Sequence, residues 1–239
     1  MKLAIIPARG GSKRIPRKNI KDFGGHPMIA WSIRAAIQSQ CFDRIIVSTD
    51  NAEIAAIAKD CGAEVPFVRP AKLSDDYAST IKVVAHAIDW LNQHGQEATH
   101  VCCIYATAPF MRASDIQLGL QVLQSTHADY AFSVTTYAFP IQRAIRFNAE
   151  QRVEMFQSEY FNTRSQDLPE AWHDAGQFYW GHAKAWLDNK PLFSQGSAPV
   201  PLPRHRVQDI DTQEDWEHAE WLFKAMQYAQ TTTSSKVND

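Results

Sequence analysis

Short apolar runs alternate with stretches of helical periodicity from the first residues to about position 136, and this alternation limits the fold more than any other feature. Apolar runs bounded by turn residues predict strands, and a 3.6-residue apolar period predicts helices. Strands that alternate with helices indicate an open, mostly parallel sheet wound on both faces. We therefore expect a doubly wound, Rossmann-like α/β fold. The expected strands are 3–6, 44–48, 65–68, 100–105, 130–136 and 177–180, and the expected helices are 27–37, 51–60, 79–93, 113–124 and 212–228.

The alternation breaks between positions 138 and 172, where the chain is polar and holds two short strand candidates, 144–147 and 152–155. This segment nevertheless carries bulky apolar side chains, namely Phe139, Ile141, Ile145, Phe147, Phe156, Tyr160 and Phe161. Apolar side chains on such an excursion usually meet a partner. We expect one α/β domain over residues 1–228, with an inserted arm at 138–172 that makes a homodimer contact, and a flexible tail at 229–239.

Composition and charge exclude several classes of protein. The 239 residues are 45% hydrophobic, which is enough for one large core. The net charge of −2 gives no general positive field that would hold the chain on nucleic acid or on an anionic membrane. The apolar run at the N-terminus ends at Pro7, too early for a signal peptide or a membrane span. The four cysteines lack metal-ligand spacing and are expected to be reduced and buried. These features predict a cytoplasmic protein.

The strongest local motif directly follows the first predicted strand and reads PARGGSKRIPRKN over residues 7–19. Open α/β sheets bind ligands at this carboxyl edge. Gly10 and Gly11 would allow close approach to a phosphate and turn backbone N–H groups toward it. The cationic side chains are Arg9, Lys13, Arg14, Arg17, Lys18 and Lys21. This density predicts a polyanionic ligand such as a triphosphate, although a solvated basic loop is the alternative. The motif is neither the dinucleotide-binding fingerprint nor a P-loop.

Two further segments are expected at the same edge. Asp209 and Asp211 lie two residues apart in an extended stretch, which would direct both carboxylates to one point. Such hard oxygen ligands suit Mg²⁺, although an N-cap Asp beside a surface Asp explains the pair equally well in isolation. In the segment 69–80, Arg69 can donate to a pyrimidine carbonyl or a phosphate. Ser79 and Thr80 either cap the following helix or contact a base.

These three motifs together resemble the CMP–sialic acid synthetases over about residues 3–225. The resemblance implies CTP as nucleotide, Mg²⁺ as cofactor, an acidic nine-carbon sugar as second substrate and a homodimer. Carried over by position, it implies a nucleotide-binding set of Ala8, Arg9, Gly10, Gly11, Ser12, Lys13, Lys18, Asn19, Arg69, Ala78 and Thr80. It also implies Asp209 and Asp211 as metal ligands.

Two segments depart from that family. Its usual Gln-Pro-Thr-Ser-Pro run reads Tyr-Ala-Thr-Ala-Pro at 105–109, and its Asn-Gly-Ala-Ile-Tyr run is replaced within 174–180. Both replacements resemble the pseudaminic acid cytidylyltransferases, which implies transfer of CMP to pseudaminic acid for a surface or flagellar glycan. The implied sugar-binding residues are Tyr105, Thr107, Arg164, Gln177 and Tyr179. A synthetase for N-acetylneuraminic or legionaminic acid is the alternative within the family. A metal-dependent glycosyltransferase and a nucleic-acid-binding module are the alternatives outside it.

The reaction implied by the resemblance is attack of the sugar's anomeric hydroxyl on the α-phosphorus of CTP, with loss of pyrophosphate. Positioning and charge stabilisation dominate such chemistry. The expected catalytic residues are Lys18 and Arg9, which would stabilise charge on the phosphates, and Asp211, which would hold the metal. The general base is left open between Asp211 and a hydroxide at the metal.

Overall fold

The structure, a computed structural model, describes the backbone of residues 1–235 and the side chains of residues 1–229. Within this part of the chain, a central sheet of six strands has the order β10-β6-β9-β5-β1-β4. The strand bounds are β1 Lys2–Pro7, β4 Arg44–Ser48, β5 His100–Ile104, β6 Tyr130–Thr136, β9 Trp172–His182 and β10 Ser197–Pro201. β1 pairs in parallel with β4 and β5, and β10 pairs in parallel with β6. β9 is antiparallel to β5 and β6, so the sheet is mostly parallel, as expected.

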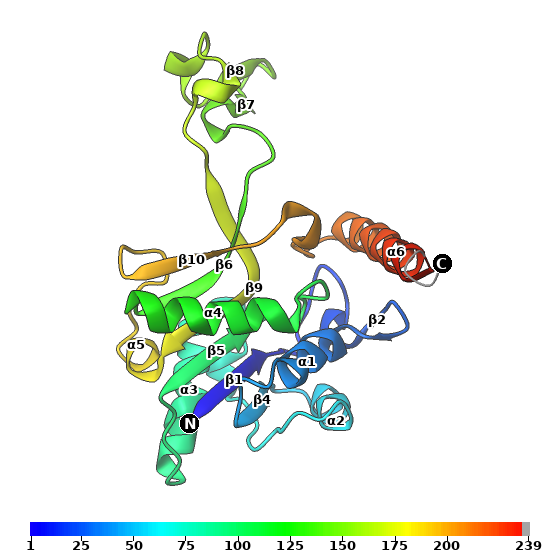
Figure 1. The fold of residues 1–239 in the computed structure, drawn as a ribbon, viewed down its shortest axis with the longest axis vertical. Helices are drawn as coiled ribbons and strands as arrows, with labels where there is room; N and C mark the ends of the chain where they lie inside the picture. The colour runs from blue at the N-terminus through cyan, green and yellow to red at the C-terminus, as the bar shows by residue number, and fades with distance from the viewer. Residues whose placement is uncertain (236–239) are drawn as a thin grey trace.

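Helices cover both faces of this sheet (Figure 1). α1 (Met28–Ser39), α2 (Ala52–Asp60) and α4 (Ala113–Thr126) pack on one face through a core that includes Ala4 and Ile6 of β1. α3 (Thr80–Gln93) and α5 (Ala183–Leu187) pack on the other through a core that includes Leu3 and Ile5. Alternate residues of β1 therefore serve opposite cores, as the two-residue period of a strand requires. The predicted doubly wound α/β fold is confirmed.

A third, smaller cluster joins the loop after β1 to the last helix, α6 (Gln213–Ser235), and includes Phe23, Phe110 and Trp216. Phe23 contacts Phe110 and Trp216 edge-on. The short elements in this region and elsewhere are β2 Asp22–Phe23, β3 His26–Pro27, η1 Lys18–Ile20, η2 Ala71–Leu73 and η6 Arg204–Arg206. This cluster fixes the position of the segment just before α6, which carries the two predicted metal ligands.

The segment between β6 and β9 projects from the sheet as an arm, at the top of Figure 1. The two short strands expected there are present as an antiparallel hairpin, β7 (Ile145–Phe147) and β8 (Val153–Met155). The rest of the arm consists of loops and the single turns η3 Ile141–Arg143, η4 Ser158–Tyr160 and η5 Ser165–Asp167. Several of its apolar side chains are exposed, including Phe139 (82%) and Phe147 (72%).

Two strand predictions need correction. The expected strand 65–68 is absent, and only Glu64 forms an isolated bridge with Ile46. Glu64 makes its ladder hydrogen bonds to Ile45 and Val47 of β4, and Val68 is exposed, so the chain leaves the sheet after Glu64. In contrast, the Pro-rich segment 191–203 is not among the expected strands, yet it contains β10. This strand lies at the edge of the sheet, where proline is tolerated.

The final helix begins where the sequence predicts it. Thr212 Oγ1 accepts from the N–H of Asp215, and the Asp215 carboxylate accepts from the N–H of Thr212, which is a reciprocal cap. The helix continues past the expected residue 228 to Ser235, and the last part of the expected tail, 236–239, lies outside the described residues. Among the helices described, none has the length and apolarity needed to cross a membrane.

Candidate active site

A cavity of about 350 Å³ opens at the carboxyl ends of β1, β4 and β5. It lies where a doubly wound sheet is expected to bind its ligand. Its lining combines the glycine loop (residues 7–21), the segment 69–83, the residues after β5 and the turn before α6. The predicted site residues that line it are Arg9, Ser12, Lys13, Lys18, Asn19, Arg69, Ala78, Thr80, Tyr105, Thr107 and Asp211. Segments that are far apart in the sequence therefore meet in one cavity, as the three motifs predict.

Four of the six cations of the glycine loop face this cavity. Arg9 and Lys13 form ion pairs with Asp76, at 2.7 and 2.5 Å. Arg14 and Lys18 pair with Asp211, at 2.7 and 3.2 Å. The other two cations lie elsewhere, where Arg17 pairs with Glu53 and Lys21 lies over the Trp216 ring. The cavity thus holds two pairs of cations, and each pair shares one carboxylate and keeps a net positive charge.

The backbone of the glycine loop differs from the expected anion nest. The N–H of Gly10 donates to the Asp50 carboxylate at 2.9 Å and is therefore not directed at a ligand. Ala8 is buried and its N–H is bonded to Ser48 of β4. Ala8, Gly10 and Gly11 do not line the cavity. A Cβ on Gly10 would come within 3.0 Å of the Asn51 side chain, so this glycine permits close packing of two loops.

Arg69 is the most deeply buried cation of the cavity, with 4% of its surface exposed. Its Nε donates to Ser74 Oγ at 3.2 Å, and its nearest carboxylate, Asp50, lies 3.8 Å from Nη2. Burial lowers the pKa of this guanidinium, and Nη2 has no hydrogen-bond partner among the residues that the structure describes. A buried donor without a partner is costly, so a ligand acceptor at this point would be strongly favoured. The carbonyl of a pyrimidine or a phosphate oxygen would supply it.

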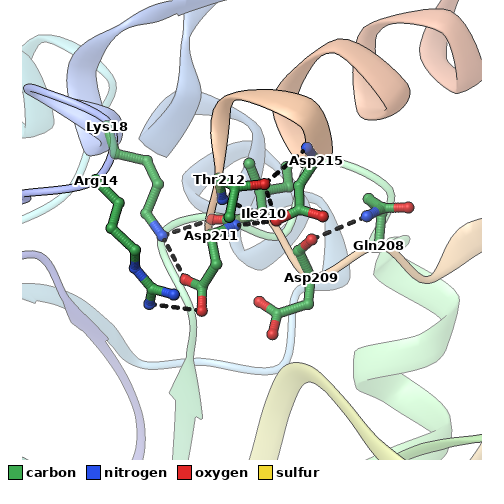
Figure 2. A network of polar contacts seen from close by, with 8 residues as sticks. All are labelled: Arg14, Lys18, Gln208, Asp209, Ile210, Asp211, Thr212 and Asp215. Carbon is green, nitrogen blue, oxygen red and sulfur yellow. Dashed lines mark hydrogen bonds and ion pairs between the residues drawn. The ribbon is translucent and has the colours of Figure 1, made fainter. Parts of the chain in front are cut away.

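The two predicted metal ligands lie in the turn that precedes α6. Figure 2 shows the Asp209 and Asp211 carboxylates on the same side of this turn, with Lys18 and Arg14 reaching Asp211. Lys18 Nζ also donates to the carbonyl of Ile210 at 2.6 Å. Burial and the neighbouring Asp211 charge raise the pKa of Asp209. Two neighbouring carboxylates form a donor set that a divalent cation would stabilise.

The described residues offer no group of three or more acidic, histidine or cysteine side chains that could hold a metal. A cation at the Asp209–Asp211 pair would therefore complete its shell with water and substrate phosphates. This is the usual arrangement for Mg²⁺, so the residues present fit that ion.

The predicted sugar-binding residues fall into three groups. Tyr105 and Thr107 line the cavity directly. Tyr179 and Gln177 lie behind them and are almost fully buried, with the Gln177 amide donating to the carbonyl of Arg206 at 2.6 Å. Arg164 is not brought to this cavity, because it lies on the arm, where it pairs with Asp167 at 2.6 Å.

Sequence reasoning missed two acidic partners of the site, Asp76 and Asp50. Asp76 pairs with both Arg9 and Lys13, and hydrogen bonds from Lys13 and Arg9 hold its pKa below the ordinary value. Asp50 anchors Gly10 and approaches Arg69. Asp50 follows the end of β4 closely, and that position at the ligand edge was a usable signal. Asp76 lies in the segment 69–80, which was expected at the same edge, but its pairing was not visible because its partners lie more than 60 residues away in the sequence.

Residues 3–234 match the cytidylyltransferase family. A pseudaminic acid cytidylyltransferase of Campylobacter jejuni is 47% identical over 222 residues, which are 93% of this chain and 96% of the relative. A CMP-N,N'-diacetyllegionaminic acid synthase of Legionella pneumophila is 31% identical over 95% of this chain and 98% of its own length. Among solved structures, a CMP:2-keto-3-deoxy-manno-octonic acid synthetase complexed with CTP superposes with a TM-score of 0.67. It is 18% identical and covers 94% of this chain and 99% of its own, so it shows the shared fold.

The family match confirms the resemblance that the three motifs predict, and it excludes both the glycosyltransferase and the nucleic-acid-binding alternative. The cavity geometry agrees with it, since cations, a buried arginine and Asp211 meet where nucleotides bind such sheets, although Asp209 of the acidic pair does not line the cavity. The chain belongs to the cytidylyltransferase family and is a nucleotidyltransferase.

Proposed function

We propose that this protein transfers CMP from CTP to pseudaminic acid and releases pyrophosphate. The observation that carries the proposal is that one cavity holds two features. These are Arg69, whose buried Nη2 lacks a hydrogen-bond partner among the described residues, and the cations of the glycine loop. A pyrimidine nucleotide with several phosphates satisfies both features at once. The Campylobacter jejuni relative, named a pseudaminic acid cytidylyltransferase, supports the choice of sugar. A reaction that consumes CTP places the protein in the cytoplasm.

In this proposal the protein's own residues bind the nucleotide, orient the sugar and neutralise charge on the phosphates. Arg69 holds the cytosine, with Ala78 and Thr80 beside it in the lining of the cavity. Arg9, Lys13 and Lys18 leave their carboxylate partners and bind phosphate oxygens, which stabilises the charge that grows on the departing pyrophosphate. Tyr105 and Thr107 form the wall on which the sugar rests, so that its anomeric hydroxyl reaches the α-phosphorus in line.

Asp209 and Asp211 would hold Mg²⁺ in this proposal. The ion, when bound, polarises the α-phosphate and neutralises the leaving group. Asp211→Ala should abolish pyrophosphate release and leave the fold unchanged, since Asp211 is partly exposed at a turn. Glu214→Ala, which removes an exposed carboxylate outside the cavity lining, is the matched control. Full turnover in Asp211→Ala, or in excess EDTA, would contradict the metal assignment.

The sugar assignment is tested by pyrophosphate release from saturating CTP with pseudaminic, N-acetylneuraminic and legionaminic acids. A site that hydrogen-bonds one ring configuration leaves buried polar groups unpaired against a stereoisomer and rejects it by orders of magnitude. We expect kcat/KM to be highest for pseudaminic acid. Equal or faster turnover of N-acetylneuraminic acid would make the protein a synthetase for that sugar instead.

The proposal includes a homodimer held by the arm. Arg164 lies on the arm and does not line the cavity of its own chain, so it can meet a sugar carboxylate only in the cavity of a partner. Arg164→Ala should then raise KM for the sugar and leave KM for CTP unchanged. Unchanged sugar kinetics would remove Arg164 from the site.

A further inference from the structure

A chain of hydroxyl groups leads from the wall of the cavity into the sheet. Tyr105 lines the cavity, and its Oη lies 3.2 Å from Thr80 Oγ1. The rings of Tyr105 and Tyr179 lie 5.2 Å apart between centroids and are tilted by 49°, which places the two phenols next to each other. Tyr179 Oη in turn donates to Asp174 Oδ2 at 2.5 Å. No role follows for Asp174 from the nucleotide site alone, because it lies outside the cavity lining.

An irregularity of β9 creates this chain. Asp174 and Tyr179 are five residues apart, and in a regular strand they would point to opposite faces and could not touch. The pairing of β6 with β9 shifts its register between these two residues, and Gly176 adopts a left-handed φ of 61°. The N–H of Gly176 donates to Asp174 Oδ1 at 2.9 Å. The bulge thus aims the carboxylate at Tyr179, and bulges are frequent beside active sites.

The donor of each hydrogen bond follows from proton counting. A phenol has one proton, and a carboxylate can only accept. Because Tyr179 gives its proton to Asp174, the proton between the two tyrosines belongs to Tyr105. The oxygen of Tyr105 is then left as an acceptor, toward Thr80 and toward the cavity. Asp174 therefore makes the cavity end of the chain ready to receive a proton from a ligand hydroxyl.

We propose that Tyr105, Tyr179 and Asp174 form a proton relay for the attacking sugar hydroxyl. This inference rests on the cytidylyltransferase reaction proposed above. As the sugar oxygen bonds to the α-phosphorus and the bond to pyrophosphate breaks, the hydroxyl proton passes to Tyr105 Oη. The Tyr105 proton passes to Tyr179 Oη, and the Tyr179 proton passes to Asp174 Oδ2. Tyr105 touches the sugar, whereas Tyr179 and Asp174 act through it as positioning residues, and Asp174 is partly exposed and releases the proton to water.

The surroundings suit such a relay. Burial raises the pKa of Tyr105, and burial raises that of Tyr179 far above its ordinary value, so both remain neutral phenols that pass protons on. The other titratable groups near Asp174 are Cys103 on β5, a buried thiol, and His173, which precedes it on β9. Burial raises the pKa of the Cys103 thiol beyond the physiological range, so Cys103 stays uncharged.

The test compares Asp174→Asn, Tyr179→Phe, Asp174→Glu and the double variant Asp174→Asn/Tyr179→Phe with the wild type. The control is Tyr130→Phe, which removes another buried tyrosine hydroxyl, one that donates to the carbonyl of Lys190 away from the cavity. We expect Asp174→Asn and Tyr179→Phe each to lower kcat about 10²-fold. The double variant should be no slower than either single variant. Asp174→Glu should recover part of kcat, and the affinity for CTP, measured by calorimetry, should change less than about twofold in every variant.

The pH profile separates the relay from a structural role. The dependence of kcat on pH should differ between the wild type and Asp174→Asn, because the variant has no carboxylate to accept the proton. An unchanged kcat, or a lower kcat with the wild-type profile, would overturn the relay alone. Absence of pyrophosphate release by the wild type with every sugar of the panel would overturn the proposed reaction and the relay together.

Discussion

Asp76 competes, at the scale of single residues, with any phosphate that Arg9 and Lys13 bind. Its carboxylate pairs with both cations, and its lowered pKa keeps it charged at neutral pH. Asp76→Asn should therefore bind CTP more tightly, by about twofold to fivefold, as expected for exposed ion pairs. Calorimetric titration at low ionic strength measures this, and the gain should shrink in 0.5 M salt because exposed charges are screened. Weaker binding by Asp76→Asn would mean that Asp76 helps to hold the nucleotide.

Lys18 and Arg9 should contribute to turnover through the charge they place beside the phosphates. Lys18→Ala and Arg9→Ala should each lower kcat/KM about 10²-fold or more, the order seen when a charge-stabilising donor is lost. Arg17→Ala is the control, because Arg17 belongs to the same loop but pairs with Glu53 outside the cavity. Steady-state kinetics with both substrates measure the effect. A change confined to KM for the sugar would mean that these cations contact the sugar and not the phosphates of CTP.

The cationic residues of the site and Asp211 were predictable from sequence, and the other acidic residues were not. Arg9, Lys13 and Lys18 are dense along the chain and follow a strand, so local sequence shows them. Asp76 and Asp174 gain their roles from contacts that local sequence does not show, one across the cavity and one through a bulge in β9. Likewise, the Asp50 bond that removes the N–H of Gly10 from the ligand depends on how two loops meet.

At the scale of elements, strands with a two-sided apolar pattern were found at their observed positions, because their burial is visible in composition. β5 and β6 are examples. The length and direction of β9 were not predictable, because it is a long antiparallel strand inserted between parallel ones, with its first residues exposed. The false strand at 65–68 shows the converse, since apolar content alone does not make a strand where the chain leaves the sheet edge after Glu64.

Helix α4 packs so closely on the sheet that there is no room for a side chain at Gly119. A Cβ there would lie 2.6 Å from the Phe178 ring and 2.7 Å from Trp180. Overpacking of this kind costs about 1–3 kcal/mol, against a gain of up to about 1 kcal/mol from helix propensity. Gly119→Ala should lower the free energy of unfolding by about 1–2 kcal/mol, measured by urea denaturation. Gly11→Ala, where a Cβ meets nothing within 4 Å, is the control and should be neutral in stability.

At the scale of the whole molecule, the arm is the part whose apolar side chains a single chain does not cover. Its apolar side chains are exposed on a hairpin and loops that project from the sheet (Figure 1). We expect light scattering to give twice the chain mass of 27.0 kDa at micromolar concentration. Phe139→Glu and Phe147→Glu should shift the protein to monomer, because a charge in an apolar contact is costly. Val68→Glu, an exposed apolar site outside the arm, should stay dimeric, and a wild-type monomer would contradict the prediction.

The continuity of β9 has a consequence for how such proteins can change their substrate. One strand runs from the root of the arm, at Trp172, to the bulge and the tyrosine behind the cavity wall. The wall residue Tyr105, the arm and the whole of β9 are therefore encoded by one uninterrupted stretch, 105–182, whereas the glycine loop and Arg69 precede it and the acidic pair follows it. Recombination that exchanges this stretch as a single cassette would bring a new sugar wall together with the arm that suits it. The nucleotide-binding residues of the glycine loop, Arg69 and the acidic pair would stay unchanged.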